Sequence, residues 1–211
     1  MRYTLVADGA SDAVLLPILT WSLKLHNVTI VEAQWADRGR IPRQPNFEAF
    51  LKSVVDLYPC EVLFVHRDAE AQPPSSRRTE IADALLWTEI RHIPVVPVRM
   101  TEAWLLADEF AIRSAAGNPN GTANLNLPDL PMLESLADPK RVLHDALTNA
   151  SGLNRRRRAQ LPVHECVRRI PGYIDDYSRL NVLPAFQTLQ TDIRELIERI
   201  PPALLLYDGQ A

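Results

Sequence analysis

The sequence predicts an α/β protein with an open, mostly parallel sheet flanked by helices and a helical C-terminal half. In the first 110 residues, short β-rich apolar segments alternate with helical segments of about 10–15 residues, an order typical of crossover units in a parallel sheet. After this point the β-rich segments stop, and helical patterns separated by loops continue to about residue 199.

Apolar runs and capping residues predict the first two strand–helix units. Residues 2–7 form an apolar strand, and Ser11 with Asp12 is typical of the start of a helix. Residues 28–35 are rich in β-formers, and Asn46 caps a second helix whose apolar residues recur at helical spacing.

The next two units repeat this order. Residues 61–67 form a third strand, and a helix starts at Ser75 or Ser76 and runs to about residue 90. Residues 93–98 form a fourth strand, and residues 102–107 are helical.

The second half has a different pattern. An Asn/Pro/Gly-rich loop over 117–131 precedes helices near 139–149, 175–180 and 182–199. We find neither an internal repeat nor a long linker in the sequence, so we expect a single domain over 1–211. Within it, residues 1–110 form the α/β core, and residues 111–211 form a helical extension packed on that core.

Composition limits the class of protein. The chain has 211 residues, of which 46% are hydrophobic, and no run of eighteen apolar residues, so we expect no transmembrane helix and no membrane partner. The strand pattern starts at Arg2 and leaves no room for a signal peptide, and Cys60 and Cys166 lack metal-ligand or redox spacing. We therefore expect a cytoplasmic protein with two buried thiols.

The positive charge consists almost entirely of arginine. Net charge is −3, which argues against a surface built throughout for nucleic acid. Arginine outnumbers lysine twenty to three. Codon bias in a GC-rich genome explains this excess, and so does a need for bidentate phosphate or carboxylate contacts.

Acidic residues follow two predicted strands. Asp8 comes after residues 2–7, and Asp68 and Glu70 follow residues 61–67. The carboxyl ends of parallel strands meet at one edge of the sheet, where ligands bind, and clustered carboxylates favour Mg²⁺ or Mn²⁺. Asp12 and Glu102 are further candidate ligands. The alternatives are a helix-capping role for Asp12 and a solvated loop position for Glu70.

Several arginines are candidates for phosphate contacts. Arg67, Arg99, Arg38 and Arg40 lie at or near predicted strand ends, where a guanidinium can hold a phosphate oxygen, although surface solubility or an ion pair explains each equally well. The best candidates for a nucleic-acid contact form a run: Arg155, Arg156, Arg157 and Arg158. A solvated helix or docking to an acidic partner are the alternatives for this run. We assign His66 no role, since a lone histidine in an apolar strand is more often a core residue.

Two stretches resemble the signature motifs of the TOPRIM fold. They are Val6-Ala7-Asp8-Gly9-Ala10-Ser11-Asp12, an acid followed by glycine with a second acid four residues on, and Leu63-Phe64-Val65-His66-Arg67-Asp68-Ala69-Glu70, two acids one residue apart after an apolar strand. The later stretch from Val95 to Asp108 resembles the TOPRIM-like DUF4276 family of bacterial proteins, as do Asp138-Pro139-Lys140-Arg141 and Leu183-Pro184-Ala185-Phe186.

The resemblance implies a Mg²⁺- or Mn²⁺-dependent nuclease or related phosphoryl-transfer enzyme acting on nucleic acid, with DNA expected before RNA and the choice between them left open, in bacterial antiviral defence or DNA repair. Asp68 and Glu70 would hold the metal, Asp8 would share it or accept a proton from water, and Asp12 and Glu102 would be secondary ligands. It also implies an ATPase protein partner.

Two substitutions depart from the family pattern. The first motif usually carries Glu where this chain has Asp8, and the second usually ends in Asp where this chain has Glu70. Both changes keep the charge, and they fit either a retuned site or one that has lost catalysis. The alternatives to the nuclease are therefore a non-catalytic interaction subunit of an ATPase-containing complex and a metal-dependent phosphatase for small phosphate esters.

Overall fold

A computed structural model describes residues 1–201 of the chain. Its α/β half contains one four-stranded sheet in the order β2-β1-β3-β4, with every neighbouring pair parallel. The strands are β1 (Arg2–Val6), β2 (Glu32–Trp35), β3 (Val62–His66) and β4 (Arg91–Val95). The predicted open parallel sheet is confirmed.

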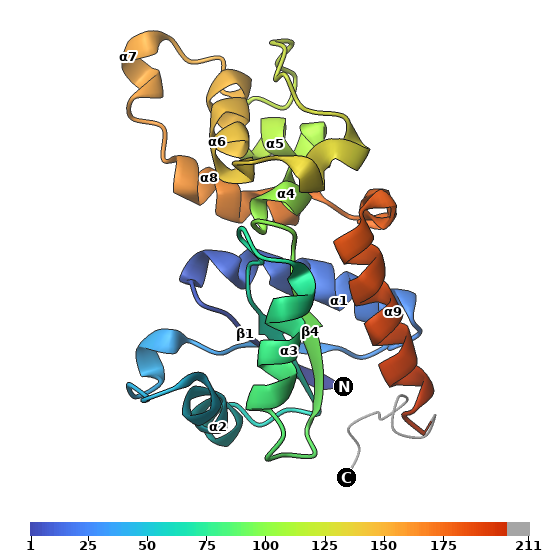
Figure 1. Cartoon of the computed structure of the whole chain (residues 1–211). Coiled ribbons are helices and arrows are strands. Elements are labelled where there is room, and N and C mark those ends of the chain that lie inside the picture. The colour runs from blue at the N-terminus through green and yellow to red at the C-terminus, as the bar shows by residue number, and fades with distance from the viewer. Residues whose placement is uncertain (202–211) are drawn as a thin grey trace.

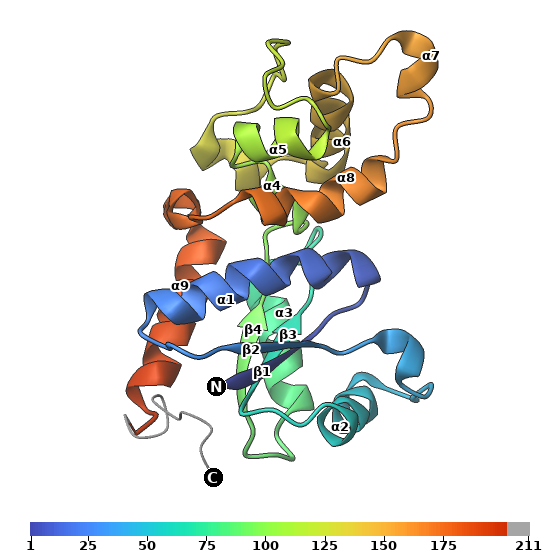
Figure 2. The same cartoon turned by 180° about the vertical axis from the view of Figure 1, so that it is seen from behind.

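Helices cover both faces of the sheet (Figures 1 and 2). On one face, α1 (Leu15–Leu25) packs on Tyr3, Leu5 and Phe64, and the 3₁₀ helix η1 (Ala10–Val14) precedes it. On the other face, α2 (Phe47–Leu57) and α3 (Pro74–Ala84) pack on Val6, Leu63 and Val65. These two cores separate the side chains of each strand into two sets, because successive residues point to opposite faces.

The C-terminal half is helical, as predicted. Its elements are α4 (Glu102–Leu105), α5 (Glu109–Ala115), η3 (Leu130–Ser135), α6 (Pro139–Ala150), α7 (Arg155–Arg158), α8 (Val163–Arg169), η4 (Ile170–Tyr173), η5 (Ser178–Val182) and α9 (Pro184–Glu198). In Figures 1 and 2, α4 to α8 lie beyond the end of the sheet from which β4 leads into α4, and α9 returns alongside the sheet. A bidentate ion pair between Arg78 and Asp192, at 2.8 and 3.0 Å, joins α3 to α9.

Several predicted boundaries are wrong. Helix α3 ends at Ala84 rather than near residue 90, because the Trp87 indole N–H donates to the Ala84 carbonyl and residues 85–88 form turns. Strand β4 runs from Arg91 to Val95 rather than over 93–98. It tolerates Pro94 because β4 is an edge strand in the described sheet and needs no partner on its far side.

The other differences concern short elements. Regular pairing in β2 begins at Glu32 rather than at residue 28, and the helix predicted over 175–180 is the 3₁₀ turn η5. Asn46 caps α2 as predicted, since its side chain accepts from the Ala49 N–H at 2.8 Å. Within residues 1–201, no helix has the length and apolar character that crossing a membrane requires.

Candidate active site

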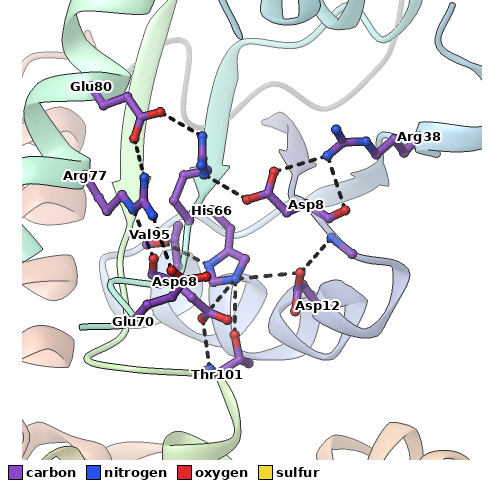
Figure 3. A network of polar contacts seen from close by, with 12 residues as sticks. Asp8, Asp12, Arg38, His66, Asp68, Glu70, Arg77, Glu80, Val95 and Thr101 are labelled. Atoms are coloured by element: carbon purple, nitrogen blue, oxygen red, sulfur yellow. Dashed lines mark hydrogen bonds and ion pairs between the residues drawn. The ribbon is translucent and has the colours of Figure 1, made fainter. Parts of the chain in front are cut away.

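The candidate site lies where the chain reverses its direction of travel across the sheet. From β1 the chain crosses to β2 on one side, and from β2 it returns past β1 to β3 on the other. The loops after β1 and β3 therefore leave toward opposite faces at the carboxyl ends of these strands, where ligands of open α/β sheets bind. Asp8, Asp12, His66 and Asp68 all lie at this edge of the sheet (Figure 3).

Strand alternation divides these residues into two groups. His66 and Asp68 follow Phe64 on the α1 face, whereas Arg67 follows Val65 on the α2 and α3 face. We call Asp12, His66, Asp68 and Glu102 the acidic side of the site. We call Asp8, Arg38, Arg43 and Arg67 its arginine side.

On the acidic side, two carboxylates flank one buried imidazole. His66 Nε2 lies 3.8 Å from Asp12 Oδ2, 3.4 Å from Asp68 Oδ1 and 3.3 Å from the Thr101 hydroxyl. His66 is 2% exposed, and its Nδ1 lies 3.0 Å from the Val95 carbonyl oxygen. A carbonyl only accepts hydrogen bonds, so Nδ1 carries the hydrogen and Nε2 faces the two acids.

Backbone N–H groups hold both carboxylates in place. The Gly9 N–H donates to Asp12 Oδ2 at 3.1 Å, and the Thr101 N–H donates to Asp68 Oδ1 at 3.1 Å. Gly9 is thereby the N-cap of η1, so the turn after β1 places Asp12. Thr101 precedes α4, so the start of the helical half places Asp68.

The acidic side favours one protonated group near neutral pH. Burial first, and then the charges of Asp12, Glu102 and Glu70, together raise the pKa of Asp68 to about 7, while the hydrogen bond from the Thr101 N–H lowers it. Burial also lowers the pKa of His66, although Asp12 opposes that effect. Asp68 Oδ1 and His66 Nε2 are 3.4 Å apart, so they can share one proton. Asp68 then does not carry a full negative charge beside the carboxylate of Asp12.

The arginine side neutralises Asp8. Arg67 Nε lies 2.8 Å from Asp8 Oδ2, and Arg38 Nη1 lies 3.1 Å from Asp8 Oδ1. Arg67 also contacts Glu80 through Nη1 at 3.0 Å, and Glu80 binds Arg77 at 2.9 Å. Figure 3 shows Asp8 turned toward Arg38, while Asp12 and Asp68 are turned toward His66. The structure therefore does not bring Asp8 into one group with Asp68.

The remaining predicted residues have varied positions. Glu102 begins α4 and acts on the pKa of Asp68, whereas Glu70 is 68% exposed and lies 3.7 Å from Arg77. The Glu70 N–H donates to the Arg99 carbonyl at 3.2 Å, and both residues have positive φ angles of 55° and 66°. The four arginines of α7 are exposed, and α7 lies at the outer end of the helical half (Figure 1).

The donor chemistry of the acidic side fits a hard divalent cation. Within residues 1–201, no three His, Cys, Asp or Glu side chains form a complete ligand set. Mg²⁺, however, usually binds one or two carboxylates and completes its octahedron with water and substrate phosphates. Asp12 and Asp68 supply two such carboxylates, and a cation would favour the charged form of Asp68, which burial and the neighbouring acids disfavour. These residues therefore fit the metal that the sequence predicts.

Three residues of the site were not predicted from the sequence. His66 was set aside as a core residue, and Arg43 and Thr101 received no role. For His66 a signal existed, since it lies two residues before Asp68 and therefore shares its face. For the others, position depends on loops that no local pattern specifies.

Comparison with known proteins does not assign the chain to a family. No family model matches the sequence, and neither a curated protein nor a solved structure matches it significantly. The TOPRIM-like and DUF4276-like character stays a prediction from the motifs around Asp8 and Asp68.

Proposed function

We propose that this chain is a Mg²⁺- or Mn²⁺-dependent phosphodiester hydrolase that acts on nucleic acid. The observation that carries the proposal is the acidic side itself: Asp12 and Asp68 flank His66 at the carboxyl ends of β1 and β3, where burial and the neighbouring acids raise the pKa of Asp68 to about 7. Groups with strongly shifted pKa values at the ligand-binding edge of a sheet are typical of catalytic centres.

Each side of the site has a role in this proposal. A bound cation would polarise the scissile phosphate and make a water molecule more acidic. Asp12 and Asp68 would hold that ion, and Glu102 would face it from the helical half. His66 is a positioning residue, because its Nδ1–H is fixed on Val95 and its Nε2 holds the proton of Asp68 when no ion is bound. The guanidinium groups beside Asp8 would attract the anionic strand.

The TOPRIM-like motifs and the arginine excess support nucleic acid as the substrate. The exposed run Arg155 to Arg158 offers a sequence-independent contact with the backbone of a strand. Three further parts of the proposal rest on the resemblance to the TOPRIM-like family alone. They are DNA before RNA as the substrate, a role in genome defence or repair, and an ATPase partner.

The proposal is tested by incubating the protein with single- and double-stranded DNA and RNA in the presence of Mn²⁺. Wild-type protein should cleave at least one substrate, Asp68→Asn should not, and chelation should abolish cleavage. Asp56→Asn is the matched control, since Asp56 is exposed on α2 and has no ion pair among the described residues. If wild-type protein and Asp68→Asn show the same background, the hydrolase is excluded and the interaction subunit takes its place.

A further inference from the structure

The arginine side opens into a cavity that the acidic side does not use. The cavity has a volume of about 570 Å³ and lies between the loop after β2, the start of α2 and the end of β3. Its charged and aromatic lining consists of Asp8, Arg38, Arg43, Arg67, Phe47 and Phe50. This volume falls in the range of small-ligand sites.

Aromatic rings and Asp8 hold two of the three arginines in place. The guanidinium carbon of Arg38 lies 5.0 Å from the centre of the Phe50 ring, and that of Arg67 lies 5.0 Å from the centre of the Phe47 ring. The same two guanidinium groups bind opposite oxygens of Asp8. Stacking on a ring occupies the flat face of a guanidinium and leaves its N–H edges available, so these side chains are ordered before a ligand arrives.

Arg43 supplies a third cation to this cavity. Within residues 1–201, it makes neither an ion pair nor a side-chain hydrogen bond. Three guanidinium groups face one carboxylate in the lining, which leaves a charge of 3 − 1 = +2. A phosphate monoester carries close to two negative charges at neutral pH, whereas a phosphodiester carries one. The lining therefore matches a monoester in charge, and arginine matches it in bidentate geometry.

We propose that this cavity, the arginine pocket, binds the phosphate monoester at the end of a nucleic-acid strand. The arginine side and the acidic side share the carboxyl edge of the sheet at the end of β3, so a strand end bound by Arg67 would pass this edge to the acidic side, where the adjoining phosphodiester would be cut. Recognition of a phosphate monoester rests on the pocket alone. Its assignment to a strand end rests on the proposed function.

The test measures binding without catalysis. Labelled oligonucleotides with a 5′-phosphate, a 3′-phosphate or only hydroxyl ends are titrated in EDTA with wild-type protein, Arg43→Ser, Arg38→Lys and Arg194→Ser. Wild-type protein should bind one phosphorylated end about 10- to 100-fold more tightly than the hydroxyl end, which is the effect of one or two charge-assisted hydrogen bonds. Arg43→Ser should remove most of this preference. Arg38→Lys should weaken the preference, because lysine keeps the positive charge but lacks the paired N–H donors with which a guanidinium binds a phosphate bidentately.

Arg194→Ser is the matched control, because Arg194 is exposed on α9, apart from α2 in both Figures 1 and 2. It should keep the full preference. Equal affinity for phosphorylated and hydroxyl ends, or a preference that survives in Arg43→Ser and Arg38→Lys, overturns the proposal. If a free mononucleotide competes with the same affinity as the phosphorylated strand, the ligand of the pocket is a small phosphate ester and not the end of a strand. If the protein prefers phosphorylated ends but does not cleave any substrate with Mn²⁺, the arginine pocket is supported and the proposed hydrolase activity is rejected.

Discussion

The acidic side and the arginine side of the site differ in what neutralises their carboxylates. On the arginine side, Asp8 lies between two guanidinium groups at 2.8 and 3.1 Å. On the acidic side, Asp68 faces Asp12 and Glu102, no arginine among the described residues pairs with its carboxylate, and burial together with these acids raises its pKa to about 7. The acids that follow β1 and β3 therefore differ in function according to the face they occupy. Asp8 holds the side chains of Arg38 and Arg67 in place. Asp68 repels the neighbouring carboxylates unless it binds a proton or a metal ion.

The largest expected effect separates Asp12 from Asp8. Asp12→Asn should lower Mn²⁺-dependent cleavage by at least ~100-fold, since it removes a ligand from the acidic side. Asp8→Asn should lower it by only about tenfold and mainly through KM, because it loosens Arg67 and Arg38 rather than the ion. Steady-state kinetics on the same substrate measures both values. Equal losses of kcat in the two variants would show that Asp8 belongs to the acidic side.

The next effect concerns stability and pH. The pKa of Asp68 is raised in the folded protein, so the folded state binds the proton more tightly than the unfolded state, and stability falls as pH rises from about 4 to about 7. Asp68→Asn removes this loss while its side-chain oxygen can still accept from Thr101. In EDTA, the variant should be more stable than wild type by about 1–3 kcal/mol at pH 8 and no more stable at pH 4. Urea unfolding at both pH values measures the difference, and a variant destabilised at pH 8 would refute the repulsion.

Asp8→Asn should have a smaller effect of opposite sign. Its carboxylate is half exposed and paired with two arginines, so its removal should destabilise the protein at pH 8 by less than about 1 kcal/mol. The same urea series measures this change. A gain in stability like that of Asp68→Asn would mean that the two acids share one environment.

The smallest effect on stability should come from the arginine run. Replacing Arg155, Arg156, Arg157 and Arg158 with serine should change the free energy of unfolding by less than about 0.5 kcal/mol, because all four are exposed. If α7 contacts phosphates, the same variant should bind nucleic acid more weakly and with a flatter salt dependence. An unchanged salt slope would assign the run to solvation or to a protein partner.

The sequence predicted the architecture better than the site. Alternating apolar and helical segments predicted the parallel sheet, and Asn46 marked the start of α2, because both signals are local. The acids after β1 and β3 were correctly placed at the carboxyl edge. Their separation into two faces was missed, although the alternation of Val65, His66, Arg67 and Asp68 contains it. The pairing of Asp8 with Arg38 could not be predicted, because Arg38 reaches it from the segment after β2, whose path depends on tertiary packing.

Calorimetric titration of Mn²⁺ at pH 8 into wild-type protein, Asp68→Asn and Asp8→Asn tests the division of the site most directly. We expect stoichiometric binding to wild type and to Asp8→Asn, and loss of binding in Asp68→Asn. Binding to wild type should be weaker at pH 6, where a proton on Asp68 competes with the ion. Loss of binding in Asp8→Asn equal to that in Asp68→Asn, or no binding to wild type, would show that the site is not divided in this way.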